Sequence, residues 1–365
     1  MGSGSTGSPL VSTGVLILPL AVLTFLWFSL GPLRAALTGV YEFALYEYDL
    51  ARTHFDDSFG TIGTDFGLTL HMGLCAFAFR PSSGAAASAA HTRAARRATC
   101  VLFALYTTSV LCGAVAHWRF GLGDGPGGTA VAALNTWQFR AIWTAVVGTV
   151  AVAGACFGRI GSALARRAGR DARRRDVGPG ATQRAWWRPA AVPDGFWRAW
   201  ALVFGLAVAL GGFSMKRPAA DIFLAGITQS PPSFYLLAVL LQPAGAPTAP
   251  ARYWTSVVRV PRRRFAALLL GLVLNAPLLF AYPILVDAWA WPLGRVNVLL
   301  HCWLQVAWGL QGYGLHGLCA ALRAEDDATA AKEAAARSPT KGSDGGASAG
   351  LRRSARKRRP VNYAT

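Results

Sequence analysis

The sequence predicts an all-α protein, a polytopic membrane helix bundle of about eight transmembrane helices. Hydrophobic residues make up 53% of the 365 residues and charged residues only 15%, well below the roughly 25% that is usual in soluble domains. Eight apolar stretches are each long enough to cross a bilayer. The basic residues avoid these stretches and gather in alternate connections, which is typical of multi-pass membrane proteins.

The first apolar stretch covers residues 10–33 and follows a Gly/Ser-rich start. A signal peptide would have a positive region before a shorter apolar core, and this stretch has neither. We therefore expect a retained N-terminal helix that joins a seven-helix core. Cleavage of this segment is the alternative.

Seven further spans follow the first. Pro231 and Pro232 lie inside one of them and remove two backbone donors, so we expect a kink or break at that point. Beyond Arg323 the chain becomes rich in Ala, Glu and Lys, then in Gly, Ser and Arg. We divide the chain into a bundle, 1–323, and a disordered basic cytosolic tail, 324–365. The seven spans are expected at 59–79, 99–118, 136–158, 198–215, 219–242, 265–288 and 295–323.

Lysine and arginine residues set the orientation of the bundle. The loops after the second, fourth and sixth spans contain four, ten and five of them, whereas the other loops contain two, one, two and one. Because basic loops stay in the cytosol, both termini are predicted to be cytosolic. The formal net charge of +19 is explained in the same way, and we expect no nucleic-acid binding. The expected partners are membrane lipids, with anionic headgroups at the basic loops and tail.

Polar residues interrupt several spans at a similar depth. On the last span, Asn297, His301 and Gln305 follow one another at single-turn intervals and share one helix face. Such a face must contact protein or water, because unpaired polar groups in hydrocarbon are costly. With the predicted orientation, ionisable residues of other helices lie in the same outer half, where they mark a functional interior. We predict an outer-side polar pocket formed by Asp65, His117, Trp137, Arg140, Asp287, Asn297, His301 and Gln305.

Two histidines and a carboxylate form a ligand set for zinc, here His117, His301 and Asp65. Zinc in such a site activates water for hydrolysis. The same residues also suit a structural role, in which His–Asp and Asn–Gln pairs bridge packed helices. His316 lies about 22 Å from His301 along a helix axis, so the two cannot share a metal.

These motifs resemble the CREST superfamily of seven-helix membrane hydrolases, which includes the alkaline ceramidases and adiponectin-receptor-like proteins. That family has Ser-x3-His on its second core helix, an Asp soon after, and His-x3-His on its last. Here His117 and His301 match the first histidine of each motif, and Asp124 stands in the place of the Asp. Gly113 replaces the Ser, and Gln305 replaces the final histidine.

The chain is also similar to an uncharacterised family of small multi-helix membrane proteins. The shared residues are Thr64–Asp65, His117, Trp137 and Asn297-x3-His301. Both resemblances cover roughly residues 60–320. The first implies a lipid amide or ester hydrolase, and the second implies no activity.

Three interpretations of function remain open from the sequence. The polar pocket and the CREST resemblance favour a hydrolase. Proline-interrupted spans are typical of a small-molecule or ion transporter or channel, where broken helices line the substrate path. A non-catalytic membrane scaffold would use the basic loops and tail alone.

Overall fold

The computed structural model describes residues 8–29, 56, 58–80, 89–120, 136–175, 189–211, 218–241, 258–275, 278, 281, 285, 289 and 291–337. Within these ranges β-structure is limited to isolated bridge residues, Ser8, Pro189 and Pro261, which confirms the all-α class. The eight helices described there are α1 (Pro9–Ser29), α3 (Phe59–Ala78), α4 (Ala90–Phe120), α6 (Trp137–Arg175), α7 (Asp194–Gly211), α9 (Pro218–Leu240), α10 (Arg262–Asn275) and α12 (Leu293–Arg337).

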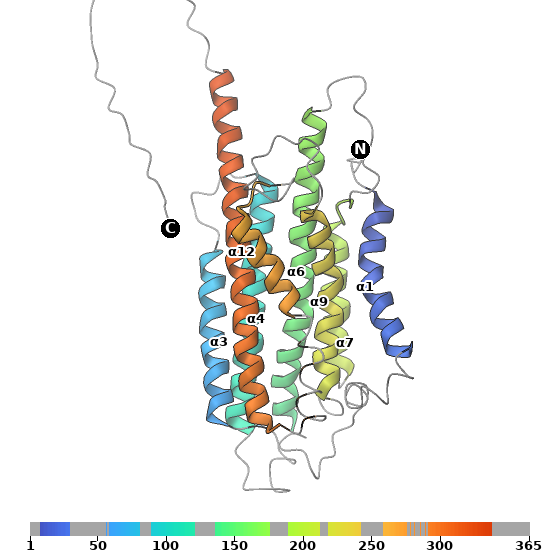
Figure 1. The fold of residues 1–365 in the computed structure, drawn as a ribbon, viewed down its shortest axis with the longest axis vertical. Coiled ribbons are helices and arrows are strands. Elements are labelled where there is room, and N and C mark those ends of the chain that lie inside the picture. The colour runs from blue at the N-terminus through green and yellow to red at the C-terminus, as the bar shows by residue number, and fades with distance from the viewer. Residues whose placement is uncertain are drawn as a thin grey trace, which may run out of the picture.

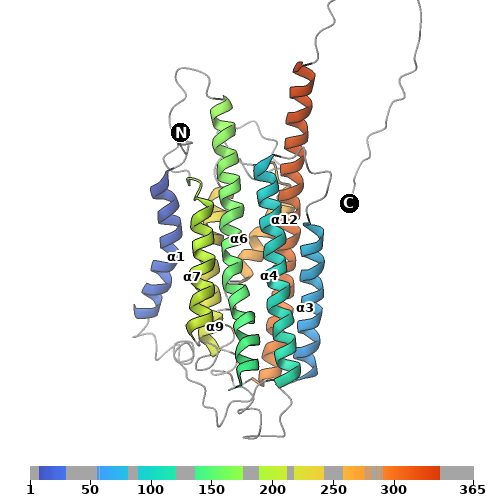
Figure 2. The ribbon, with the colours of Figure 1, turned by 180° about the vertical axis from the view of Figure 1, so that it is seen from behind.

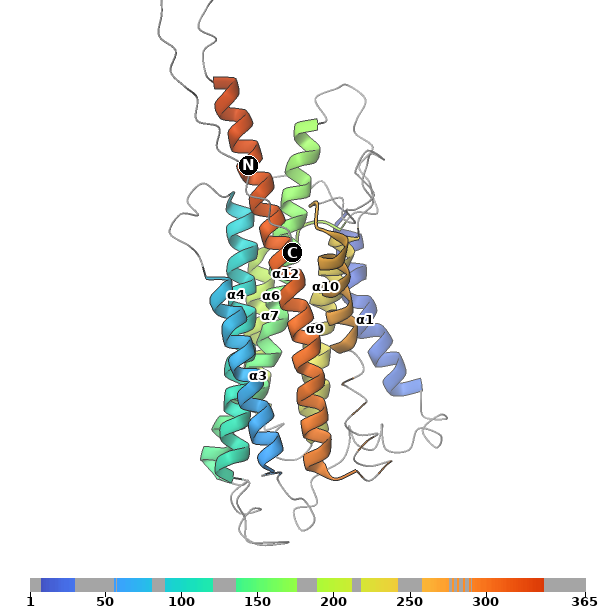
Figure 3. The same ribbon diagram turned by 60° about the vertical axis from the view of Figure 1, so that its left-hand side comes forward.

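The helices lie side by side along the long axis of the molecule (Figure 1). The central helix α6 packs against α4, α7 and α9, while α12 packs against α3 and α10. Seen from behind, α1 and α3 occupy opposite edges of the bundle (Figure 2). The shorter α10 lies near the end at which α6 and α12 extend furthest (Figure 3). In the expected seventh span, α10 ends at Asn275, and Leu278, Ala281 and Leu285, which are described singly, are also helical.

Two of the described helices, Ala90–Phe120 and Trp137–Arg170, are long and apolar enough to cross a membrane, judged by length and composition. They support association of the chain with a membrane. The other long helices include α3 and α12, whose polar residues lower their mean hydropathy; Asp65 and His301 are examples.

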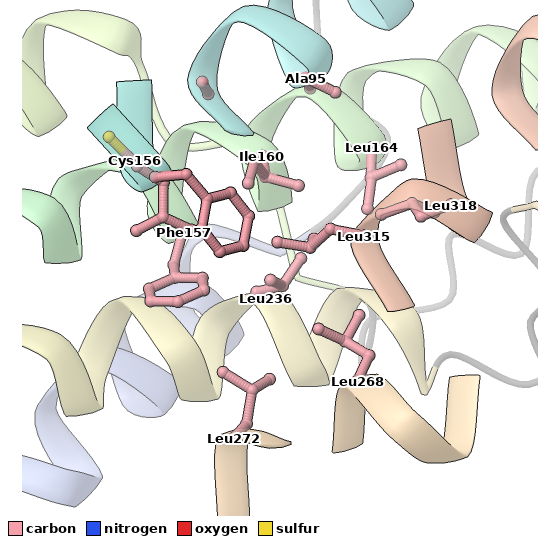
Figure 4. Packing of buried hydrophobic residues seen from close by; sticks show 14 of the residues in the cluster. Ala95, Cys156, Phe157, Ile160, Leu164, Leu236, Leu268, Leu272, Leu315 and Leu318 are labelled. Carbon is pink, nitrogen blue, oxygen red and sulfur yellow. The ribbon is translucent and has the colours of Figure 1, made fainter. Parts of the chain in front are cut away.

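The apolar core joins α6 to its neighbours through large side chains and close helix contacts. Figure 4 shows Phe157, Ile160 and Leu164 of α6 packed with Leu236, Leu268 and Leu315 of other helices. Glycines allow the backbones of α6 and its neighbours to approach. A methyl group on Gly154 would lie 2.4 Å from the Thr228 carbonyl oxygen of α9. In lipid, little hydrophobic force drives helices together, and small residues at their contacts allow the close packing that replaces it.

The prolines of α9 do not interrupt it, so the expected break at Pro231 and Pro232 does not occur. Pro232 has no N–H to donate to the carbonyl of Thr228, four residues earlier. The indole Nε1–H of Trp200 on α7 donates to that oxygen instead, at 3.2 Å. A neighbouring helix thus supplies the hydrogen bond that the proline removes.

α12 continues as a helix to Arg337, so the tail boundary expected after Arg323 is wrong for residues 324–337. On this extension, Glu325 and Asp326 pair with the buried Arg167 of α6 at 3.1 and 2.7 Å. Asp326 also accepts the N–H of Ala89, next to the start of α4, at 2.9 Å. Glu325 accepts the N–H of Arg259 at 2.9 Å. We call these contacts the Arg167 latch; residues 338–365 lie outside the described part of the chain.

The Arg167 latch predicts that substitutions of the adjacent residues Asp326 and Asp327 will destabilise the protein to very different extents. Asp326→Ala leaves the buried Arg167 with one carboxylate fewer, and losing one partner of a buried pair costs roughly 3–5 kcal/mol. Asp327→Ala removes only a pair at 3.9 Å from Arg323, with the Asp327 side chain 61% exposed, and should change stability by less than about 1 kcal/mol. Thermal unfolding of the full chain in detergent measures both, and equal effects would contradict the latch.

Candidate functional site

The candidate site lies between α3 and α12, which run parallel and in contact. Two close approaches set their register. A methyl group on Gly60 would lie 2.9 Å from Val298, and one on Gly309 would lie 2.9 Å from His71. The same register brings Asp65 of α3 against His301 of α12.

Asp65 and His301 form the centre of the site. The Nε2 atom of His301 lies 3.3 Å from Oδ1 of Asp65, and its Nδ1 atom lies 3.0 Å from the hydroxyl of Thr64. Asp65 is 3% exposed, yet its second oxygen, Oδ2, has no hydrogen-bond partner. A buried polar atom of this kind marks a place where water, an ion or a ligand completes the interactions.

His117 of α4 lies next to this pair. Its ring centroid is 6.4 Å from that of His301, and the two rings meet edge to face. Its Nδ1–H donates to the backbone carbonyl of Asp56 at 2.7 Å. Because a carbonyl oxygen can only accept, the hydrogen bond places a proton on Nδ1 and fixes the ring orientation.

Asp56 joins the three helices of the site. Its carboxylate accepts hydrogen bonds from the Ser58 N–H at 2.9 Å and from the Thr61 hydroxyl, at the start of α3. It also accepts from Nδ2 of Asn297 on α12 at 2.9 Å. Its backbone carbonyl holds His117, so one residue contacts α3, α4 and α12. We call Asp56, Asp65, His117, Asn297 and His301 the polar cluster.

The charge of Asp56 is favoured by these contacts. Burial raises the pKa of Asp56, but the hydrogen bonds from Thr61, the Ser58 N–H and Asn297 outweigh burial and lower the pKa below its ordinary value. Asp56 is therefore ionised at neutral pH.

Asp56 lies between the first and second expected spans and is not among the predicted pocket residues. The available signal was local: an acid and a serine just before an apolar helix are typical of a helix N-cap. Ser58 does cap α3, accepting the N–H of Thr61 at 3.3 Å. The hydrogen bond from Asn297, 241 residues away in the chain, could not be inferred from any local sequence pattern.

The structure gathers four of the eight predicted pocket residues, Asp65, His117, Asn297 and His301. Gln305 lies half-buried one turn beyond His301. Trp137 and Arg140 are exposed, Trp137 at 74%, so their assignment to the pocket is wrong. The inward face of α6 at this level instead holds Phe139 and Trp143, which stack at 5.6 Å. Asp287 and Asp124 lie outside the described residues.

The predicted zinc set does not come together. Zinc needs donor atoms about 2.0–2.2 Å from a common point. Among the described residues, no three His, Cys, Asp or Glu side chains are arranged to hold a metal. Nδ1 of His117 is already engaged by the Asp56 carbonyl, and His301 faces Asp65. The arrangement can bind and move protons, but it does not fit a three-ligand zinc centre.

Comparisons of the chain with protein-family models, with curated proteins and with solved structures found no match.

The polar cluster predicts different roles for two histidines of α12. His301→Ala removes the partner of the buried Asp65 and of Thr64, which costs roughly 1–3 kcal/mol. His316 is exposed, fifteen residues further along α12, so His316→Ala should cost much less. Thermal unfolding in detergent compares the two variants. Equally small effects would show that the cluster contributes nothing to stability.

Proposed function

We propose that the chain is an eight-span integral membrane protein with both termini in the cytosol. The Arg167 latch supports this topology, because it brings together the first residues of α4, the later part of α6, residue 259 before α10 and the extension of α12. These are the basic ends of the helices, where Arg93, Arg166 and Arg262 lie. Basic ends gathered on one side favour a cytosolic position for that side.

Exposed apolar side chains support a lipid contact around the bundle. On α3, Phe66, Leu70 and Leu74 are 44%, 67% and 61% exposed and lie on the face opposite Asp65 and Leu68. Lipid chains would cover this face, and anionic headgroups would contact the basic ends.

Labelling of introduced cysteines tests the topology. In intact cells, a membrane-impermeant thiol reagent should modify Gly125→Cys but should reach Gly180→Cys only after permeabilisation. The labelling of the parent protein, which has six cysteines, is subtracted as background. Modification of Gly180→Cys from outside would overturn the orientation.

We further infer that the protein is a proton-linked transporter of a small solute, in which Asp65 and His301 bind the proton. The buried Asp65 carboxyl carries this proposal, with one oxygen on His301 and the other without a partner. An ionised carboxylate beside a neutral imidazole would be an uncompensated buried charge, which is very costly. The pair is therefore stable with one added proton, held on either partner. Such residues form the proton relays of membrane transporters.

A path for the proton leads from the outer end of the bundle to this pair. Asp56, ionised and located before α3, lies at that end. His117 is bound to Asp56 and adjoins His301. The three groups Asp56, His117 and His301 thus connect the end of the helices to the buried Asp65.

Proton uptake by the reconstituted protein tests the proposal. With an acidic exterior and a pH-sensitive dye inside, liposomes that contain wild-type protein should acidify faster than empty liposomes. Asp65→Asn should reduce the rate to that of empty liposomes, because the amide cannot take up the proton. Asp194→Asn changes an exposed acid of α7 and should behave like wild type. Wild-type liposomes that acidify no faster than empty ones, or an active Asp65→Asn protein, would overturn it.

One observation favours a hydrolase as the second candidate. Thr64, His301 and Asp65 place a hydroxyl, an imidazole and a carboxyl in sequence, as in metal-free acyl-transfer sites. Against it, the Thr64 hydroxyl also lies 2.8 Å from the Gly60 carbonyl, its usual acceptor in a helix. Thr64→Val separates the candidates: it removes the nucleophile of a lipid amide or ester hydrolase but leaves Asp65 able to take up a proton.

A further inference from the structure

We propose that the Oδ2 atom of Asp65 and the hydroxyl of Thr69 bind a small monovalent cation. This inference rests on the proposed transport function and extends it by naming the class of solute. It starts from two buried oxygen atoms on the same helix that have no hydrogen-bond partner.

Thr69 differs from five other threonines inside the helices. Thr64, Thr99, Thr107, Thr108 and Thr149 each donate to the carbonyl four residues earlier, at 2.7–3.0 Å. This local bond is the default for a helical threonine in an apolar setting. The buried Thr69 hydroxyl makes no such bond. Its orientation therefore leaves it available to another ligand.

The two oxygens lie on the same side of α3. Residues 65 and 69 are one turn apart, and side chains of a helix lean toward its N-terminus. Thr69 therefore leans toward Asp65. Side chains at this spacing lie about 5–6 Å apart at Cβ, which leaves a bound ion or water between their oxygens.

The helices around Asp65 leave room beside Oδ2. On α4, the residue facing this atom is Gly113, and a methyl group there would lie 3.6 Å from Oδ2. With no side chain at position 113, an ion can approach Oδ2 from α4. Gln305 of α12, one turn beyond His301, is level with Thr69 in the register that pairs Asp65 with His301. Its amide oxygen can complete the ligand set together with water.

Charge and chemistry select the ligand class. Among the described residues, His301 is the only ion-pair partner of Asp65, so no Lys or Arg neutralises this carboxylate. When the added proton leaves the pair, the Asp65 carboxylate balances one positive charge, which favours a monovalent over a divalent cation in its place. Carboxylate, hydroxyl and amide oxygens are ligands for hard cations and suit neither copper nor zinc.

The stability of the full-length protein in detergent tests this site, with sodium as the probe. At pH 8, sodium chloride should raise the unfolding temperature in a saturable manner relative to choline chloride at equal ionic strength, because a ligand of the folded state stabilises it. Thr69→Val should require at least about tenfold more sodium, which is the loss expected from one oxygen ligand. Thr69→Ser keeps the hydroxyl and should respond like wild type.

Thr107→Val is the matched control, since its hydroxyl is satisfied by the Phe103 carbonyl at 2.7 Å. It should retain the full sodium response. A wild-type protein with no sodium-specific stabilisation would overturn the inference, as would an undiminished response in Thr69→Val. If proton uptake still depended on Asp65 in that case, the transport proposal would stand without the cation site. Loss of both properties would remove both proposals.

Discussion

The hydrogen bonds of Asp56 determine how three helices meet at one end of the bundle. Its carboxylate holds the start of α3 and Asn297 of α12, and its carbonyl orients His117 of α4. Within a bilayer, water cannot replace lost hydrogen bonds, and helices attract one another only weakly through apolar surface. One residue therefore links the start of α3, Asn297 of α12 and His117 of α4.

The two ends of the bundle carry its charged networks, and a middle section built of uncharged side chains separates them. At mid-length, Tyr106 of α4 stacks on Trp308 of α12 with ring centroids 3.9 Å apart. Gln229 of α9 accepts from Tyr106 at 3.2 Å and donates to the Val150 carbonyl at 3.1 Å. Both α4 and α12 take part in the polar cluster and in the Arg167 latch. A rigid shift of α12 at one end would therefore strain contacts at the other.

Much of the fold could be predicted from the sequence, because apolar length and polar interruptions are local signals. The single-turn spacing of Asn297 and His301 placed them on one face, and depth alone grouped them with Asp65 and His117. The rotation of each helix about its own axis could not be predicted from depth. Trp137 and Arg140 were therefore wrongly assigned to the inward face of their helix, although both are exposed. The Arg167 latch was not predicted because Glu325 and Asp326 lie in a polar stretch that is typical of a solvent-exposed tail. The sequence does not indicate that Arg167 is their buried partner.

Two residues at the polar cluster differ from what the resemblance to the CREST motifs would imply. Gly113, in place of the family's serine, faces Oδ2 of Asp65 and leaves that oxygen uncovered by a side chain. Gln305, in place of the final histidine, contributes a neutral amide where a metal centre would need a nitrogen ligand. The Gln305 change removes one nitrogen ligand of such a metal centre, and the Gly113 change leaves the Asp65 carboxyl open to another ligand. They favour a site that binds a proton or one small cation over a site built around a divalent metal.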